Sequence, residues 1–335
     1  MGFNDVTRLN TVQIGTITRP TGGGVSTPLT LPKTGLLKRL HLIITGAVSG
    51  TLSAPNALGM ASIVSRVRLT LNSGIDVFNL SGAAYHYLLR NFHDINFDPL
   101  TAATPNNARA AVTATTYNIS MVIDVMVNSR DPLGLILLQN EQTQATLTVE
   151  WLADASVATG ATVTGTCVVY MEYFTVPQPD PKDPAGVNSN MPPLNLIHQT
   201  LEDQQTISAA GDYVYQWLRG NIYLQVLHGL GIGVSGADSF TRARLRLNQS
   251  NFIYDFATVP QLLDMQYAMN HPAARLLGVI PFDLIGSSGL GQFGMSRDMI
   301  DSARLTDIAT VIAATGAATL YTVRRQLVRI AAPQG

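Results

Sequence analysis

Side chains whose type and spacing could do chemistry are few and scattered in this sequence of 335 residues. Two glycine patterns, Gly231 to Gly236 and Gly289 to Gly294, have the Gly-x-Gly-x-x-Gly spacing that lets a backbone approach the pyrophosphate of a dinucleotide. That motif needs a strand before it and a helix that opens on it. The first pattern precedes a predicted strand and the second lies in no β-α-β unit. Both therefore indicate glycine-rich turns.

The six histidines do not form a metal-binding pattern. No two of them have the spacing of a His-Glu-x-x-His helix or of a zinc clip. His86 and His93 lie near one predicted helix, with Asp94 adjacent, and could share a face. A metal site there stays an alternative, and a helix with a polar end is the interpretation we favour. The full set is His41, His86, His93, His198, His228 and His271.

Nothing in the sequence predicts a catalytic centre. There is no Gly-x-Ser-x-Gly motif, and the candidates for a pair of catalytic carboxylates, Glu141, Glu150 and Glu172, fall on different predicted strands or loops. A serine, a histidine and an acid that meet only in space stay open. The single cysteine, Cys167, excludes a disulfide scaffold and a Cys-based zinc site, and its apolar neighbours predict a buried thiol. We predict no catalytic residue, no cofactor and no metal.

The composition favours a surface that is covered by other chains. Charged residues make up 13%, against about 25% in an average soluble protein, and hydrophobic residues make up 46%. The 21 basic and 22 acidic side chains give a formal charge of −1, which disfavours specific binding to nucleic acid. The N-terminus lacks a signal-peptide pattern, and no apolar run approaches the roughly 20 residues of a membrane span. These features predict a soluble chain made in a cytoplasm.

The sequence of one predicted strand occurs twice in the chain. Ser65–Asn72 aligns without a gap on Thr241–Asn248, with five identities in eight positions. In each copy leucines alternate with polar residues, which predicts a strand with one buried face that ends in a turn. The polar face carries Arg66, Arg68, Arg242, Arg244 and Arg246. These arginines form either a basic binding surface or, as we favour, an outer face that is solvated or ion-paired.

The elements around the repeated strand also occur twice in the same order. Each half has a hairpin, a short helix, a loop and three closing strands, and six prolines in 177–193 separate the halves. We predict an N-terminal arm at 1–24, a first domain at 25–177, a proline-rich linker at 178–195 and a second domain at 196–335. The predicted fold is all-β, with two tandem eight-stranded jelly rolls that each carry a short helix after a β-hairpin.

With this arrangement, two stretches resemble a known family. The first is SRVRLTLNSGIDVFNLSG (Ser65–Gly82), which precedes a helix, and the second is DPLGLILLQNEQTQATLTVEW (Asp131–Trp151). Together they are similar to double jelly-roll major capsid proteins of tailless icosahedral bacteriophages with an internal membrane, such as tectiviruses. The resemblance covers residues 25–333 as an arrangement of elements and short stretches as sequence.

The resemblance implies a structural role without catalysis. Three chains would form a trimer with a pseudo-hexagonal outline, and trimers would tile an icosahedral shell. Further partners would be minor capsid and vertex proteins, and the N-terminal arm would face the internal membrane or a neighbouring trimer. The chain would be assembled in the host cytoplasm and end in the virion. The alternatives are a tandem β-sandwich that binds carbohydrate and an amidase-type enzyme on paired jelly rolls.

Overall fold

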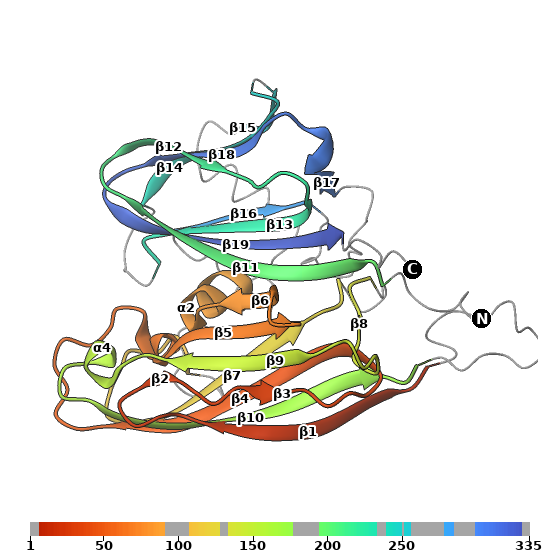
Figure 1. The fold of residues 1–335 in the computed structure, drawn as a ribbon. Coiled ribbons are helices and arrows are strands. Elements are labelled where there is room, and N and C mark those ends of the chain that lie inside the picture. Colours follow the sequence, from red (N-terminus) through yellow and green to blue (C-terminus); the bar gives the residue numbers. More distant parts are fainter. Residues whose placement is uncertain are drawn as a thin grey trace, which may run out of the picture.

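The computed structural model describes residues 7–90, 107–127, 133–176, 194–232, 239–249, 251–255, 278–284 and 299–329. Strands dominate these residues, and the predicted all-β class is confirmed (Figure 1). The chain forms two β-sandwiches, one stacked on the other, with the first at the bottom of Figure 1 and the second at the top.

The first sandwich packs two sheets face to face. One sheet has the strand order β1-β10-β4-β7, with β8 at the end of β4, and the other has the order β6-β5-β9-β2, with β3 also on β9. The strands are β1 (Leu9–Thr18), β2 (Gly24–Val25), β3 (Leu29–Thr30), β4 (Leu36–Ser49), β5 (Val64–Leu71), β6 (Ile75–Leu80), β7 (Thr116–Asp124), β8 (Ile136–Leu137), β9 (Ala145–Trp151) and β10 (Thr162–Phe174). Short helices connect them: η1 (Gly59–Ile63), α2 (Gly82–Ala84), the π-helical turn η2 (Tyr85–Leu89) and α4 (Asp154–Val157).

The second sandwich repeats this topology. Its sheets have the orders β11-β19-β13-β16 and β12-β18-β14-β15, with β17 also on β13. The elements are β11 (Leu196–Ile207), β12 (Gly211–Gln216), β13 (Ile222–Leu230), β14 (Phe240–Leu247), β15 (Asn251–Asp255), β16 (Val279–Asp283), β17 (Ile300–Asp301), η4 (Ser302–Arg304), β18 (Ile308–Ala314) and β19 (Ala318–Arg329). Strand for strand, β1, β4, β7 and β10 correspond to β11, β13, β16 and β19. The prediction of two successive eight-stranded jelly rolls is confirmed.

The repeated strand forms equivalent hairpins, β5-β6 and β14-β15. The two hairpins have the same register: Arg68 pairs with Asn79, and the residues 176 positions later, Arg244 and Asp255, also pair with each other. Both hairpins also contain a β-bulge at the same point, after Leu69 in the first and after Leu245 in the second. A β-bulge is a specified feature of a strand pair, so its repetition shows that the two hairpins share one design.

The asparagine that ends each repeated strand has a defined task. Asn72 and Asn248 both have a positive φ, of 50° and 49°, and the next residue is also at positive φ, as a type I′ turn requires. The Asn72 side chain accepts a hydrogen bond from the backbone N–H of Gln144 at 2.8 Å, and Asn248 accepts one from Thr306 at 2.9 Å. Each asparagine thus ties its turn to the strand that follows next in the sheet.

A second shared bulge aligns the remaining strands. The extra residue is Lys38 in β4 and Leu224 in β13. When Lys38 is matched with Leu224, Ile43 in β4 corresponds to Gly229 in β13. The registers of β10 with β1 and of β19 with β11 then match the positions of β1 with those of β11. The matched positions are Leu9 with His198, Asn10 with Gln199, Thr11 with Thr200, Val12 with Leu201 and Gln13 with Glu202.

The expected N-terminal arm is wrong for Leu9–Thr18. These residues form β1, which pairs antiparallel with β10 and supplies the first strand of the jelly roll. The stretch looked like an arm because β1 is an edge strand that is mostly exposed, so it shows no apolar alternation. The domain therefore begins before residue 25.

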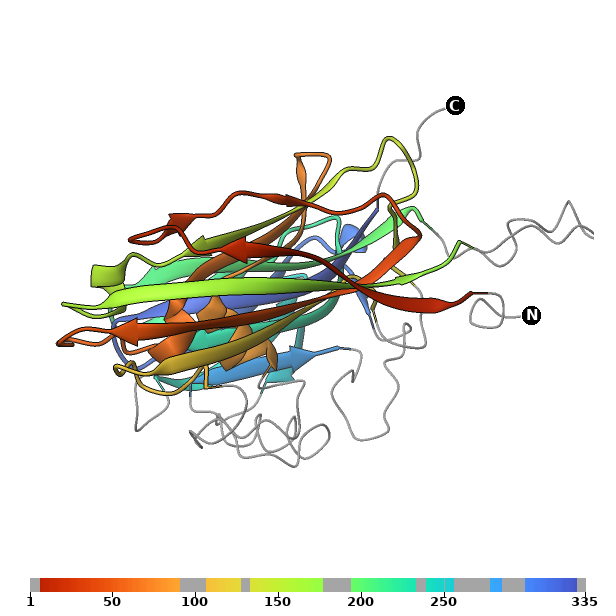
Figure 2. The ribbon, with the colours of Figure 1, turned by 90° about the horizontal axis from the view of Figure 1, so that it is seen from below.

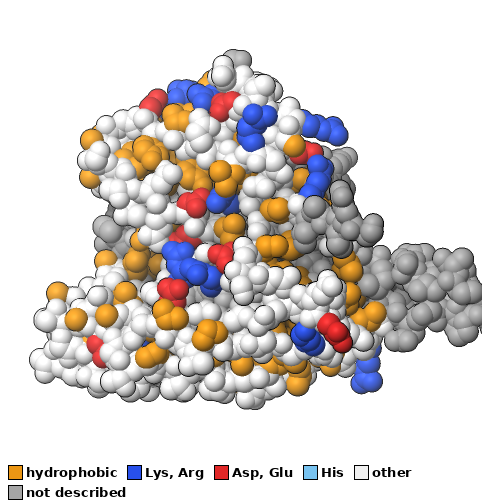
Figure 3. Space-filling model, in the orientation of Figure 1, with side chains coloured by type: hydrophobic (Ala, Val, Ile, Leu, Met, Phe, Trp, Pro, Cys, Tyr) orange, Lys and Arg blue, Asp and Glu red, His pale blue; other side chains and the backbone are white. Residues whose placement is uncertain are grey.

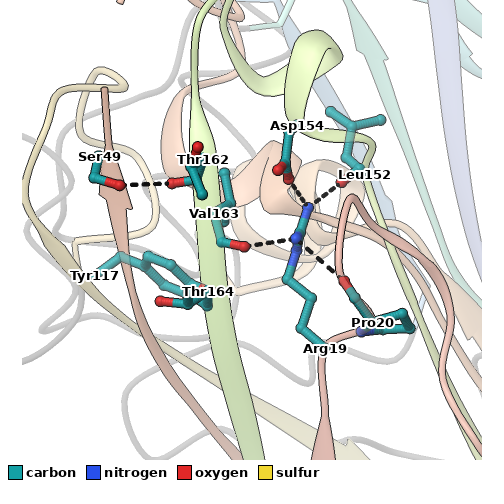
Figure 4. Close-up of polar contacts among 9 residues, drawn as sticks. All are labelled: Arg19, Pro20, Ser49, Tyr117, Leu152, Asp154, Thr162, Val163 and Thr164. Atoms are coloured by element: carbon teal, nitrogen blue, oxygen red, sulfur yellow. Dashed lines mark hydrogen bonds and ion pairs between the residues drawn. The ribbon is translucent and has the colours of Figure 1, made fainter. Parts of the chain in front are cut away.

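Arg19, directly after β1, anchors the strand (Figure 4). Its guanidinium donates to the carbonyl oxygens of Val163 and Leu152, each at 2.7 Å, and to Asp154 Oδ1 at 2.5 Å. The Arg19 side chain is 1% exposed. Because a buried charge is stable only with partners, this cluster fixes the end of β1 against β10 and α4.

Two other expectations need correction or lie outside the described residues. The sequence of Tyr213–Gly229 is expected to match the region of Leu36–Gly46, but it contains parts of two strands, β12 and β13. The helix after the first hairpin is confirmed in α2 and η2, where Ser81 caps the N-terminus by accepting from Ala84 N at 3.1 Å. The matching helix from Thr258 lies outside the described residues, as does most of the proline-rich linker.

The turn asparagines give a test of the equivalence. We expect Asn72→Ala and Asn248→Ala each to lower the free energy of unfolding by about 1–2 kcal/mol, because alanine resists a positive φ and removes the acceptor. Glycine tolerates that φ, so Asn72→Gly and Asn248→Gly should cost less than the alanine variants. Denaturant unfolding measures all four. Equal costs for alanine and glycine at both sites would contradict the assigned geometry.

Candidate functional site

The repeated arginines are engaged with neighbours on their own sheets. Arg66 donates to Asn79 Oδ1 at 2.8 Å, Arg244 pairs with Asp212 at 3.2 Å, and Arg246 pairs with Asp307 at 3.1 Å. Arg68 lies 3.9 Å from carboxylate oxygens of both Asp76 and Glu150, and Arg242 has an interaction of its own. On the face seen in Figure 3, basic and acidic side chains lie interspersed. The ion-paired interpretation of this polar face holds.

The three candidate carboxylates are not brought together. Glu150 lies on β9 and Glu172 on β10, which belong to opposite sheets of the first sandwich, and both side chains alternate with buried neighbours and so point outward. Glu141 lies in an exposed loop. Glu172 accepts from His41 Nε2 at 2.6 Å and pairs with Lys38 Nζ at 3.1 Å. Burial works against the charged form, but hydrogen bonds from His41 and Lys38 and the charges of Lys38 and Arg39 hold the pKa of Glu172 below its usual value. This is a surface ion-pair cluster.

The histidines and the cysteine have structural surroundings. His86, in η2, is fully buried, and desolvation, with Arg90 and Arg109 nearby, holds its pKa well below the usual range. His228 lies between Thr322 Oγ1 at 2.9 Å and Thr310 Oγ1 at 3.0 Å, and burial lowers its pKa to about 3. Cys167 is buried, and burial raises the pKa of its thiol to about 12.

Other expected positions fall partly outside the described residues. His93 and Asp94 lie there, as do Gly289 to Gly294 and most of the first glycine pattern, whose Gly231 ends β13 at a φ of 69°. Among the residues described, no three His, Cys, Asp or Glu side chains gather as metal ligands would. In the same part of the chain, no helix has the length and apolarity to cross a membrane.

The two sandwiches contact each other through a pair of strands. Strand β6, at the edge of the first, pairs in parallel with β11 of the second, with Phe78 opposite Thr200 and Asn79 opposite Leu201. This pairing joins one sheet of each sandwich into a single sheet of ten strands. Among the described strands, every other pairing is antiparallel, so the parallel pairing is found only where the two jelly rolls meet.

A polar clasp closes this contact beside the paired strands. The Glu202 carboxylate accepts from Ser81 N at 2.5 Å, from Ser81 Oγ at 3.0 Å and from Gln204 Nε2 at 2.6 Å. Three residues before Glu202 on β11, Gln199 Nε2 donates to the carbonyl oxygen of Asp76 at 2.7 Å. Ser81 also caps α2, so one residue holds both the helix and the second jelly roll.

The helical segment after β6 seats on the outer face of the second jelly roll. A Cβ added at Gly229 of β13 would lie 2.6 Å from Leu88 Cδ2 in η2, so glycine lets this helix pack closely without moving the Leu88 side chain. The core of the first sandwich extends through this contact to Leu227 and Val323. Farther along, Arg325 is buried and donates to the carbonyl oxygen of Val127 at 3.3 Å. The interface therefore combines apolar packing with buried hydrogen bonds between the two sandwiches.

At the level of sequence, neither a family description nor a curated protein matches the chain. Solved structures do match over nearly its whole length. The major capsid protein of STIV, Sulfolobus Turreted Icosahedral Virus, aligns with a TM-score of 0.71 at 15% identity, over 96% of this chain and 97% of the other. That of bacteriophage PM2 aligns at 0.56 and 9%, over 97% and 99%. A PBCV-1 virus capsid chain aligns at 0.63 and 10%, over 97% and 94%.

This chain has the double jelly-roll fold of viral major capsid proteins. The match includes both jelly rolls, because it covers 96% of the residues. The resemblance inferred from the sequence is confirmed for the fold, and the feature that unites the double jelly roll is the β6–β11 contact.

Sequence reasoning missed the residues that join the two jelly rolls. Glu202 and Gln199 lie on β11 and Arg325 lies on β19, and their polar character alone does not indicate a contact between domains. The only available signal was the density of polar residues in Leu196–Ile207, which no alternation explained. A short helix after the first hairpin was expected from the sequence, but the hydrogen bonds between Ser81 and Glu202 were not.

Glu202 provides a test of the clasp. We expect Glu202→Ala to lower the free energy of unfolding by about 2–3 kcal/mol, because it leaves the buried Ser81 N–H and hydroxyl without an acceptor. Glu141→Ala, a matched change in an exposed loop, should stay within about 0.5 kcal/mol of the parent. Denaturant unfolding at one fixed protein concentration gives both values. Equal effects would contradict the role assigned to Glu202.

The buried histidines predict a pH dependence. The unfolded chain protonates His228 near pH 6.5, but the native state resists protonation down to about pH 3. As the pH falls below 6.5, the unfolded state binds the additional proton, and stability drops by up to about 1.4 kcal/mol per pH unit for each such histidine. Unfolding titrations between pH 7 and 5 should show this slope, and His228→Gln should reduce it. An unchanged slope in the variant would contradict the assignment.

Proposed function

We propose that this chain is a major capsid protein that acts as a structural building block without catalysis. The observation that carries the proposal is the alignment of both jelly rolls, over nearly the full chain, with major capsid proteins of viruses. The described candidate side chains support it, because His86, His228 and Cys167 are buried, Glu172 is ion-paired, and no three potential metal ligands gather among the described residues. The low charge of the chain fits a surface that is largely covered by neighbours.

Three copies form the building block in this proposal. Two equivalent jelly rolls in one chain give six in a trimer, and six similar domains fill a pseudo-hexagonal site in a lattice. Such trimers then tile an icosahedral shell, with minor capsid and vertex proteins at the remaining positions. The two sandwiches of one chain are already held by an apolar contact and a shared sheet, so each chain supplies two joined jelly rolls.

Contact with an internal membrane remains a further part of the proposal. The arm assigned to that role was 1–24, but β1 uses Leu9–Thr18 within the jelly roll. The residues left for an arm are those before β1, and residues 1–6 lie outside the described part of the chain. We place the mature protein in the virion, after synthesis and assembly in the host cytoplasm.

The mass of the purified full-length chain tests the proposal. Light scattering coupled to size exclusion should give three times the 35.9 kDa of one chain, because the trimer is the stable building block. The measurement should be repeated over a wide concentration range at low and high salt. A chain that is monomeric throughout would contradict the proposal, and so would a stable dimer with two-fold symmetry, which leaves no pseudo-hexagonal outline.

A further inference from the structure

Strands β1 in the first jelly roll and β15 in the second each lie at the edge of a sheet. Strand β1 lies at one edge of the sheet β1-β10-β4-β7, and β15 lies at one edge of β12-β18-β14-β15. Within the described residues, neither pairs with a strand on its outer side. An open edge presents a row of backbone donors and acceptors that can pair with another chain.

The internal repeat shows what such edges do in this molecule. Strand β1 corresponds to β11 in the second jelly roll, and β15 corresponds to β6 in the first. Strands β6 and β11 are paired with each other in parallel within one chain. One pair of these corresponding edge strands, β6 and β11, is therefore joined inside the chain. The other pair, β15 and β1, is not joined within the described residues. A second copy would present the missing partner for each.

The exposure of corresponding side chains in the two jelly rolls agrees with a second copy that covers β1 and β4. His198 in β11 is 1% exposed beside the first jelly roll, but its counterpart Leu9 is 45% exposed. Gly229 in β13 is buried against Leu88, but its counterpart Ile43 in β4 is 40% exposed. The sheet that carries Leu9 and Ile43 lies at the front in Figure 2. Large apolar side chains therefore lie open where the second jelly roll is covered by the first.

The polar and apolar groups on the two free edges also suit each other. Inside the chain, Gln199 and Asp76 line one groove, and the Gln199 amide donates to the Asp76 carbonyl oxygen. The counterpart of Gln199 is Asn10, which again carries a side-chain amide. The counterpart of Asp76 is Phe252, which is 37% exposed. Val12, 42% exposed, is the counterpart of Leu201 in the same groove, so an apolar contact with Phe252 becomes available.

We propose that β15 of one copy pairs in parallel with β1 of the next copy, and that Tyr254 then lies opposite Thr11 and Asp255 opposite Val12. This pairing repeats the internal register of Phe78 with Thr200 and Asn79 with Leu201. Phe252 packs on Val12 of the neighbour, and Asn10 of the neighbour donates to the Phe252 carbonyl oxygen. The inference rests on the proposed capsid function and names the surface through which its copies associate.

The pairing is heterologous, because β15 of one copy meets β1 of another. Heterologous contacts close into a ring or continue as a filament, according to the rotation that each contact imposes. Inside the chain, the same contact relates one jelly roll to the next. Three chains that use it alternately within and between copies form a ring of six jelly rolls with every β1 and β15 edge paired. The trimer therefore has one repeated contact rather than two unrelated ones.

Cross-linking of paired cysteines tests the inference on the full-length chain. We expect Asn10→Cys combined with Phe252→Cys to give covalent dimers and trimers with a short bismaleimide, because the two residues meet between copies. The pair Asp76→Cys with Gln199→Cys should cross-link within one chain and leave the mass of the band unchanged. The pair Asn10→Cys with Val214→Cys, in which Val214 is 43% exposed on β12, should give at least tenfold less covalent oligomer. Native Cys167 is buried and should not react.

The outcomes separate this inference from the proposed function. Trimers by light scattering without cross-linking of Asn10 and Phe252, while the internal pair reacts, would overturn the strand pairing and leave the capsid function standing. A chain that never assembles would overturn both. If the cysteines disturb assembly, hydrogen exchange of the wild-type trimer decides. The amides of Leu9 to Gln13 should exchange at least tenfold more slowly in the trimer than in dissociated chains, and equal rates would overturn the pairing.

Discussion

An unpaired edge of a β-sheet is the constraint on which this structure depends. A sheet edge exposes backbone N–H and C=O groups that must find water or a partner, and an apolar neighbourhood excludes the water. The chain meets this requirement once by pairing β6 with β11 across its two jelly rolls. That parallel contact creates the ten-stranded sheet, sets the second jelly roll against the helical segment after β6, and extends the first core to the outer face of β13 and β19.

The polar residues near this contact serve the architecture. Glu202 accepts hydrogen bonds from the backbone N–H and the hydroxyl of Ser81, and Gln199 donates to the carbonyl oxygen of Asp76. These bonds replace hydrogen bonds to water that the groups would make if the two jelly rolls were apart. Arg19 plays the same part at the end of β1, where four oxygen acceptors surround one buried guanidinium. Burying such groups costs free energy unless each is paired, and their pairing makes the arrangement of strands specific. Residues that could do chemistry are here used to hold strands in register.

Much of the fold was predictable because it follows from alternation and turns. Leu69 and Leu71 alternate with polar residues, and Asn72 ends the strand, so the hairpin and its repeat were visible in the sequence. Strand β1 was not, because an exposed edge strand carries no apolar face. Strand β11 was not either, since its outer face is buried by the other jelly roll through His198, Thr200 and Glu202 rather than through aliphatic side chains. Burial that arises between domains leaves no periodic signal within one of them.

The central claim is that one contact joins jelly rolls both within the chain and between copies. Single-particle electron microscopy of the purified full-length assembly tests it most directly. The account predicts a three-fold particle with six jelly rolls around the axis, in which β1 of each copy continues the sheet that ends in β15 of its neighbour. A three-fold particle in which β1 and β15 face solvent, or a particle without three-fold symmetry, would contradict it.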